Sequence, residues 1–111
     1  MWIFTKYGYL SIVEHKDMDN YFQIRSREIR PLQKYWPKYD IDIIEWADYR
    51  FRITIKKNIA LKKLIKIIEE INYINFKNQC SDSREYHDAL ADIWSRMYFF
   101  QSEMISKSQE R

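Results

Sequence analysis

The segment from Tyr49 to Lys56 alternates apolar and polar side chains without a break. Successive side chains of a β-strand point to opposite faces, so this pattern predicts a strand with one buried and one exposed face. The buried face is expected to carry Tyr49, Phe51, Ile53 and Ile55, and the exposed face Arg50, Arg52, Thr54 and Lys56. A pairing shift of one residue would bury the charged set, so the segment restricts the chain to sheets with one covered face.

The segment from Tyr21 to Arg27 alternates in the same way and predicts a second half-buried strand. One face is expected to carry Phe22, Ile24 and Ser26, and the other Tyr21, Gln23, Arg25 and Arg27. Residues 2–14 are rich in aromatic and β-branched side chains, and they predict one strand with a bulge or sharp bend at Gly8. The polar run 16–20 joins the two strands as a hairpin.

A further strand and a short helix are predicted between these segments. Pro31 suits the first turn of a helix, where its missing N–H is no loss, and Pro37 ends that helix. Its apolar edge is formed by Leu32, Tyr35 and Trp36. Residues 41–46 predict a strand, and the short connection Ala47-Asp48 joins it to the segment from Tyr49 as a second hairpin.

Two longer helices follow. Asn58 is expected to cap the first of them. Its buried face carries Leu61, Leu64, Ile65, Ile68 and Ile71, and its solvent side Lys62, Lys63, Lys66, Glu69 and Glu70. Asp82 and Glu85 resemble a capping box, which predicts that the last helix begins there and runs to about Met104.

The order of these elements is strand, strand, helix, strand, strand, helix, helix. It predicts an α+β fold (ββαββαα), a circularly permuted ferredoxin-like arrangement with a four-stranded antiparallel sheet and helices on one face. The segments 21–27 and 49–56 would lie in the middle of that sheet. A chain of 111 residues supports one domain. We expect it over residues 1–105, with a frayed polar tail at 106–111.

Composition excludes several classes of protein. Apolar residues make up 46% of the chain, which is typical of globular proteins rather than disordered ones. The single glycine excludes glycine-rich phosphate loops, and the single cysteine cannot form an internal disulfide, so a cytoplasmic location is the default. Apolar runs are too short for a membrane helix or a signal-peptide core. The net charge of +3 suits weak attraction to polyanions but falls short of a dedicated duplex binder.

The best functional lead is the charged face of the two middle strands. Arginine side chains form bidentate contacts with phosphates and carboxylates. The pattern therefore predicts a non-catalytic binding module that holds a single-stranded nucleic acid or an acidic protein surface. Its binding residues would be Arg25, Arg27, Arg50 and Arg52, with Lys56 and Lys77 as peripheral charges. Tyr21 is the only aromatic residue placed there, so phosphate holding or protein contact is favoured over base stacking. The alternative is a solvated face that blocks edge pairing.

The last helix offers a second lead, because its apolar arc is wide. One stripe follows four-three spacing and consists of Tyr86, Leu90, Ile93, Met97, Phe100 and Met104. Beside it lies a second stripe of Trp94, Tyr98 and Ile105. Such a stripe either packs internally or forms a protein interface, which makes a homodimer or an interaction or inhibitor module the alternative function.

Catalysis is the third reading, as a small hydrolase or nuclease. His15, His87 and Cys80 are the usual base and nucleophile types, but no spacing joins them. Asp17 and Asp19 are more typical of a turn than of a cation site. We therefore predict no catalytic residues, no metal and no cofactor.

The chain also resembles a group of small uncharacterised bacterial proteins that open with M-W-x-F-T-x-x-G-x-x-S-x-V. The likeness lies in residues 1–8 with Ser11 and Val13, in the runs 25–27, 48–52 and 75–77, and in residues 86–97. No activity is established for that group, so it implies no catalytic or ligand residues. It does suggest a polar set for mutation: Thr5, Ser11, Arg25, Arg27, Asp48, Tyr49, Arg52 and Lys77.

Overall fold

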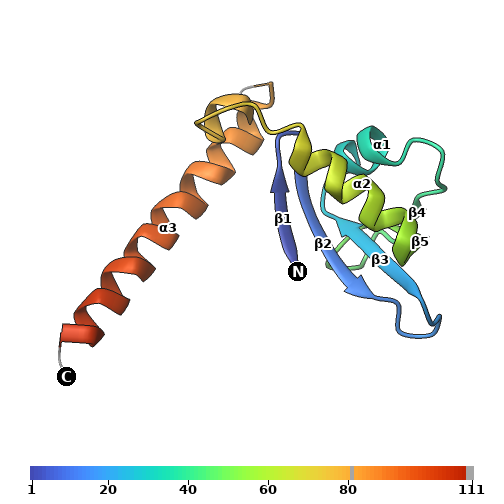
Figure 1. The fold of residues 1–111 in the computed structure, drawn as a ribbon, viewed down its shortest axis with the longest axis horizontal. Helices are drawn as coiled ribbons and strands as arrows, with labels where there is room; N and C mark the ends of the chain where they lie inside the picture. Colours follow the sequence, from blue (N-terminus) through green and yellow to red (C-terminus); the bar gives the residue numbers. More distant parts are fainter. Residues whose placement is uncertain (81, 110–111) are drawn as a thin grey trace. The chain divides into compact units, whose positions relative to one another are not determined.

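The computed structural model describes residues 1–80 and 82–109 (Figure 1). The chain divides into two compact units, Met1–Asn72 and Tyr73–Arg111. We call them the sheet unit and the helical unit and describe each by itself. The single domain expected over residues 1–105 therefore stays a prediction.

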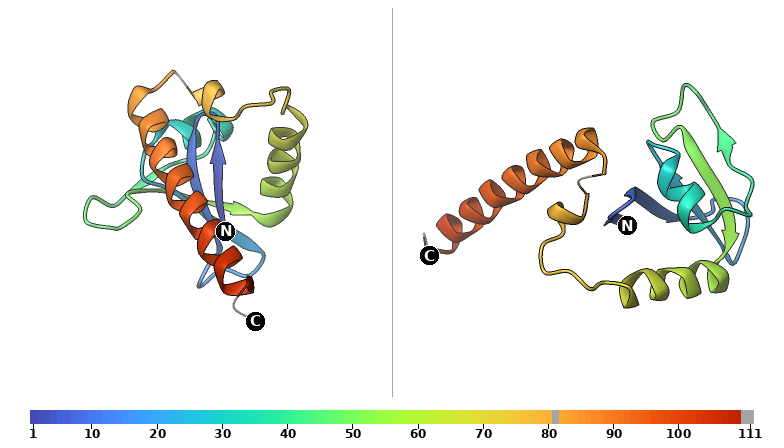
Figure 2. Two further views of the ribbon diagram at one scale, coloured as in Figure 1. Left: turned by 90° about the vertical axis from the view of Figure 1, so that its left-hand side faces the viewer. Right: turned by 90° about the horizontal axis from the view of Figure 1, so that it is seen from above.

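The sheet unit contains an antiparallel sheet. Its elements in chain order are β1 (Trp2–Thr5), β2 (Gly8–Glu14), β3 (Tyr21–Ser26), α1 (Arg30–Tyr35), β4 (Asp42–Ile43), β5 (Phe51–Lys56) and α2 (Lys57–Glu69). The strand order is β1-β2-β3-β5-β4. Figure 1 labels these elements, and Figure 2 gives two further views of the ribbon. The two alternating segments thus lie side by side in the interior of the sheet, as expected. The mixed α+β class is confirmed, and the ferredoxin-like permutation stays a prediction.

The predicted number of strands is wrong, because residues 1–80 form five strands rather than four. The segment expected to be one bent strand is the hairpin of β1 and β2, in which Ile3 pairs with Leu10 and Thr5 with Gly8. The Thr5 hydroxyl stabilises the turn: Oγ1 donates to the Gly8 carbonyl over 2.8 Å and accepts from the Gly8 N–H over 3.2 Å. What reads as a bend in the sequence is a reversal of the chain.

Gly8 is required at this turn for two reasons. Its φ of +154° is a conformation that residues with a Cβ rarely adopt. A Cβ atom at this position would also lie 2.7 Å from Cγ of Pro31, in the first turn of α1. The turn and α1 therefore approach each other as closely as a glycine allows.

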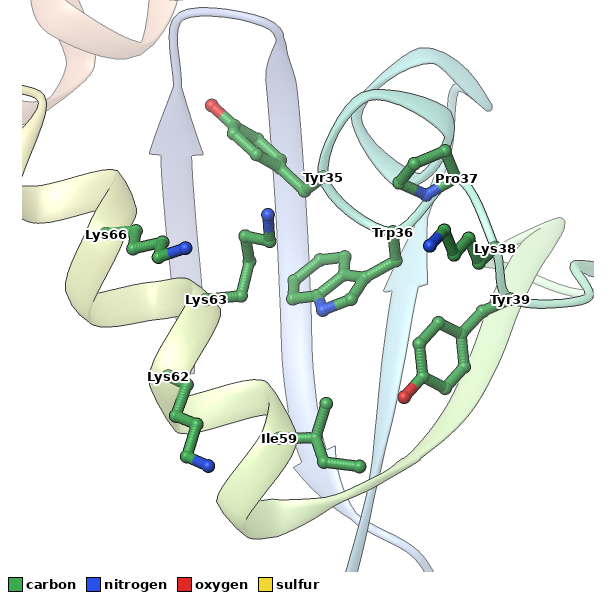
Figure 3. A pocket seen from close by; sticks show the side chains of 9 residues that line it. All are labelled: Tyr35, Trp36, Pro37, Lys38, Tyr39, Ile59, Lys62, Lys63 and Lys66. Carbon is green, nitrogen blue, oxygen red and sulfur yellow. The ribbon is translucent and has the colours of Figure 1, made fainter.

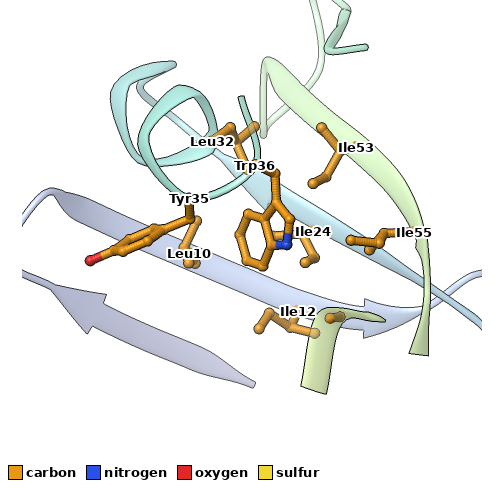
Figure 4. Close-up of a cluster of buried hydrophobic side chains, with 9 residues drawn as sticks. Leu10, Ile12, Ile24, Leu32, Tyr35, Trp36, Ile53 and Ile55 are labelled. Carbon is orange, nitrogen blue, oxygen red and sulfur yellow. The ribbon is translucent and has the colours of Figure 1, made fainter. Parts of the chain in front are cut away.

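The hydrophobic core lies on one face of the sheet (Figure 4). The strands contribute Leu10, Ile12, Ile24, Ile53 and Ile55, and the helical segments contribute Leu32, Tyr35, Trp36 and Ala60. Ile12, Ile24 and Ile53 are direct partners across three strands, so they share this face. Both α1 and α2 therefore pack on the same side of the sheet, which we call the covered face.

The second hairpin differs from the prediction. Only Asp42 and Ile43 of the expected strand 41–46 pair with β5, opposite Arg52 and Phe51. Residues 44–50 form the connection, which is closed by a 2.8 Å hydrogen bond from the Ile44 N–H to the Arg50 carbonyl. The predicted two-residue turn at Ala47-Asp48 is therefore a longer loop. Ile41, Ile43 and Ile44 are β-branched and promote a strand, but of these three only Ile43 pairs with β5.

Helix α2 begins earlier and faces differently than predicted. It starts at Lys57 directly after β5, so Asn58 lies inside the first turn and does not cap it. Ala60 is buried, with Leu64 and Ile67 packed against the core. Four residues predicted to be buried are exposed instead: Leu61, Ile65, Ile68 and Ile71. Because β5 runs straight into the helix, the strand sets its rotation and brings the small Ala60 side chain onto the sheet.

The helical unit consists of η1 (Lys77–Cys80) and α3 (Arg84–Gln109), which pack against each other. The cap of α3 is Ser83, whose Oγ accepts from the Tyr86 N–H over 3.2 Å, so the predicted Asp82–Glu85 box is one residue early. The helix continues to Gln109 without glycine or proline to stop it. Residues 106–109 of the expected tail are therefore helical, and 110–111 lie outside the described residues.

No helix in the described parts of the chain has the length and apolarity needed to cross a membrane.

Candidate functional site

Opposite the covered face lies a sheet face that neither α1 nor α2 covers, which we call the outer face. One row of directly paired residues runs across it: Trp2, Ser11, Arg25, Arg52 and Asp42. Paired residues in an antiparallel sheet share a face, and their Cβ atoms are about 4.5–5.5 Å apart. The pairing of β3 with β5 therefore places Arg25 and Arg52 together at the centre of the outer face.

Neighbouring side chains hold both central arginines in place. Arg25 Nη2 donates to Ser11 Oγ over 2.8 Å, and its guanidinium lies 4.5 Å from the centre of the Tyr49 ring. Arg52 Nε donates to the Tyr49 carbonyl over 3.2 Å, and its Nη1 donates to Gln23 Oε1 over 3.3 Å. Arg25 Nε is buried and has no hydrogen-bond partner among the described residues. The ion pairs found among the described residues do not involve Arg25 or Arg52, although Asp42 is the cross-strand partner of Arg52 on this face.

Arg27 lies beside this pair and is bound to the loop between β4 and β5. Its Nη1 contacts Asp48 Oδ1 at 2.6 Å and the Asp48 carbonyl at 3.1 Å, and its guanidinium lies 4.4 Å from the centre of the Tyr49 ring. The hydrogen bond to Asp48 raises the pKa of Arg27, against a smaller opposing effect of desolvation. The two side chains are 52% and 74% exposed, so the ion pair is open to competition from another anion.

The ring of Tyr49 contacts two of the arginines on the outer face. Tyr49 is only 5% exposed, but it lies outside the core cluster, between the guanidinium groups of Arg25 and Arg27. The prediction that Tyr49 faces the core is therefore wrong. Alternation holds only within a paired strand, and β5 begins at Phe51. The residue two places earlier is free to turn to the other face.

Tyr49 also forms a phenol pair with Tyr9, their hydroxyl oxygens 2.8 Å apart. Burial, and next the hydrogen bond with Tyr49, raise the pKa of Tyr9. Burial opposes ionisation of Tyr49, but the hydrogen bonds from Tyr9 and Ser11 and the charge of Arg27 outweigh it and lower the pKa of Tyr49. Tyr9 is therefore the donor of the pair when one phenol is ionised.

Aromatic rings from the first hairpin extend this cluster. Phe4 stacks on Tyr9 with ring centres 4.7 Å apart and planes 15° apart, and Trp2 meets the Tyr9 ring edge to face at 5.9 Å. Trp2 is 67% exposed. Sequence reasoning missed these residues because it did not recognise the reversal at Gly8. The signal was present in the alternation of Trp2 and Phe4 on one side with Ile3 on the other.

The other predicted binding residues lie elsewhere. Arg50 Nη2 is 3.5 Å from the Glu45 carbonyl, in the loop that precedes β5. Lys56 pairs with Tyr21 at the far end of β5 from Arg52. Lys77 belongs to the helical unit, where its Nζ lies 4.7 Å from the centre of the Trp94 ring. The structure therefore brings together Arg25, Arg27 and Arg52 and leaves Arg50 and Lys56 apart from them.

The candidate catalytic residues His15, His87 and Cys80 each contact groups that are close to them in the sequence. His15 Nδ1 accepts hydrogen bonds from the Asp17 and Met18 N–H groups, each over 3.1 Å, and so closes the turn after β2. His87 is 3.9 Å from the neighbouring Asp88 carboxylate. Cys80 is buried, with its Sγ 3.4 Å from the Phe76 carbonyl. Within residues 1–80 and 82–109, no group of three or more His, Cys, Asp or Glu side chains could hold a metal ion.

The aromatic face of α3 is largely exposed. Leu90 is buried, but both predicted stripes beyond it are about half exposed: Ile93, Met97, Phe100 and Met104 on one, and Trp94, Tyr98 and Ile105 on the other. Trp94 and Tyr98 stack on each other with ring centres 5.7 Å apart.

Comparisons with family models, with curated proteins and with solved structures found no match for this chain. The resemblance to the small bacterial proteins therefore stays a prediction.

Proposed function

We propose that the outer face binds single-stranded nucleic acid without catalysing a reaction on it. The observation that carries this proposal is the placement of Arg25, Arg27 and Arg52 around Tyr49 on the face that α1 and α2 leave open. Guanidinium groups fixed by neighbouring side chains lose little entropy when they bind phosphate, because they are already oriented.

The aromatic rings favour a nucleic acid over an acidic protein surface. Proteins that bind single strands combine cationic side chains for the backbone with aromatic rings on which bases stack. Trp2 is exposed beside Phe4 and Tyr9, and its strand lies next to the one that carries Ser11, the partner of Arg25. In this arrangement a base stacks on Trp2 at one end of the outer face. The phosphates of the strand bind the arginine side chains on the other part of that face. An acidic protein would use the arginines alone.

The test is the affinity for a fluorescently labelled oligouridylate, measured by anisotropy at two salt concentrations. Three phosphate contacts on a single strand predict that affinity falls about 20-fold between about 50 and about 200 mM salt. In the variant Arg25→Ala/Arg52→Ala one contact remains, and the salt effect is expected to shrink to about threefold. Trp2→Ala should weaken binding by the loss of about 1–3 kcal/mol of stacking.

Arg50→Ala is the matched control, because it removes the same charge two residues from Arg52 but outside the cluster. It should leave both affinity and salt dependence nearly unchanged. An equal effect of Arg50→Ala and Arg52→Ala, or no binding at the lower salt concentration, contradicts the proposal. Binding of a polyglutamate peptide but not of the oligonucleotide would identify an acidic protein as the partner.

A second candidate function is self-association through α3, which the exposure of its apolar stripes favours. The four-three spacing is typical of paired helices. In an antiparallel pair that sets Met97 against Phe100 of a second copy, Ile93 meets Met104 and Arg96 lies opposite Glu103 of that copy. Within one chain Arg96 and Glu103 are 3.7 Å apart and highly exposed, so they can exchange partners at little cost.

Light scattering over a range of concentrations tests this pairing. A dimer is expected, and Met97→Glu should make it monomeric because it places a charge in the central layer. Arg96→Glu should weaken the dimer, and Arg96→Glu/Glu103→Arg should restore it. A monomer at every concentration, or no rescue by the exchange of charges, contradicts the pairing.

A further inference from the structure

A cavity of about 340 Å³ opens in the sheet unit between α2 and the segment that follows α1 (Figure 3). Sites for small molecules are typically about 300–1,000 Å³, so it can take a compact ligand. Trp36 and Tyr39 line one side, and Ile59 and the lysines of α2 line the other. These residues lie around the covered face, so the cavity is separate from the arginines of the outer face.

One wall of this cavity is a cationic stripe. Ile59, Lys62, Lys63 and Lys66 follow the spacing that places side chains on one side of a helix. None of the described residues that line the cavity is acidic. No ion pair found among the described residues uses Lys62, Lys63 or Lys66. The charge of the stripe is therefore available to an anion.

The opposite wall is aromatic and carries an unsatisfied donor. Trp36 is 3% exposed, and its Nε1 is buried without a hydrogen-bond partner among the described residues. Figure 3 shows the indole nitrogen on the side of the ring that faces Ile59. A buried N–H without an acceptor destabilises the protein, and an acceptor on a bound molecule would remove that penalty.

We propose that this cavity binds a small amphipathic anion. Its apolar body packs against Trp36, Tyr39 and Ile59, an acceptor atom takes the hydrogen bond from Trp36 Nε1, and its carboxylate, sulfonate or phosphate lies on the stripe of Lys62, Lys63 and Lys66. The apolar wall excludes a bare inorganic anion as a good ligand, and the lysines disfavour a neutral one.

The test uses naphthalene-2-sulfonate as the probe and 2-naphthol as the neutral control of the same ring system. NMR spectra of the full chain and of Trp36→Phe identify the indole N–H signal of Trp36 as the one that the variant lacks. Addition of the sulfonate should change the chemical shift of that signal, and the change should saturate as the sulfonate concentration rises. Removal of the charge, as in 2-naphthol, should weaken binding about tenfold or more.

Matched variants test the role of the lysines. Lys62→Ala/Lys66→Ala replaces exposed helix positions by a good helix former, so the fold is kept, and it should also weaken the sulfonate about tenfold or more. Lys16→Ala/Lys107→Ala removes the same charge elsewhere and should have little effect. Arg25→Ala/Arg52→Ala should bind the probe normally, which separates this site from the outer face. A Trp36 signal that does not move, or equal losses in the two lysine variants, overturns the proposal.

Discussion

The two faces of the central strands differ although they share one backbone. Ile24 and Ile53 are fully buried on the covered face, and the residues next to them in the chain, Arg25 and Arg52, lie on the outer face. Core packing therefore fixes the backbone positions from which the arginines project. The covered face stabilises the sheet, and the outer face can carry function at little cost in stability.

The largest expected effect is on the covered face. Ile53→Ala removes a fully buried side chain from the centre of the core and should lower the free energy of unfolding by about 2–5 kcal/mol. Arg52→Ala, one residue away, should change it by less than about 1 kcal/mol. Urea unfolding of both variants measures the contrast, and equal losses would show that the two faces do not differ in this way.

A smaller loss is expected at the turn that joins the first two strands. Gly8→Ala forces a Cβ into an unfavourable φ and against Pro31, which should cost about 1–3 kcal/mol. Pro31→Ala in the same chain relieves only the contact, so the double variant should recover part of the loss. A fully stable Gly8→Ala protein would disagree with this turn geometry.

Within the outer face, the phenol pair is expected to stabilise the fold modestly. Tyr49→Phe keeps the ring between Arg25 and Arg27 but removes the 2.8 Å hydrogen bond with Tyr9. The expected loss is about 0.5–1.5 kcal/mol in the free energy of unfolding. Tyr9→Phe should give a similar loss, and the double variant should lose less than the sum. Additive losses would mean that the two hydroxyl groups do not interact.

The smallest effect is expected for the ion pair between Arg27 and Asp48. Both side chains are more than half exposed, so a double-mutant cycle with Arg27→Ala and Asp48→Ala should yield about 0.2–1 kcal/mol of coupling. The coupling should decrease as salt is added, because exposed charges are screened. A coupling well above this range would place the pair among the main stabilising contacts rather than among groups open to a ligand.

The sequence predicts the faces of β3 and β5 because alternation has a physical cause within a paired strand. It therefore places Arg25 and Arg52 together correctly. It fails at Tyr49 and Arg50, since pairing of β5 begins at Phe51 and alternation no longer applies. It also misses the aromatic rings of Trp2, Phe4 and Tyr9, because a lone glycine fits a bulge and a reversal equally well.

Packing between elements decides the remaining features. The rotation of α2 depends on the direct junction with β5, and periodicity alone allows Leu61 or Ala60 on the buried side. The cavity beside Trp36 results from that rotation, because it turns the lysine stripe toward the aromatic segment after α1. The spacing of residues within a single segment therefore cannot predict the rotation of α2 or the cavity.

The most direct test of the outer face as a ligand surface is amide and indole chemical-shift mapping during titration with a short oligouridylate. We predict that the perturbed signals belong to Trp2 and to outer-face residues of β2, β3 and β5, including Ser11, Arg25 and Arg52. Perturbation confined to Lys62, Lys63 and Lys66 of α2, or distributed over the whole chain, would contradict the account.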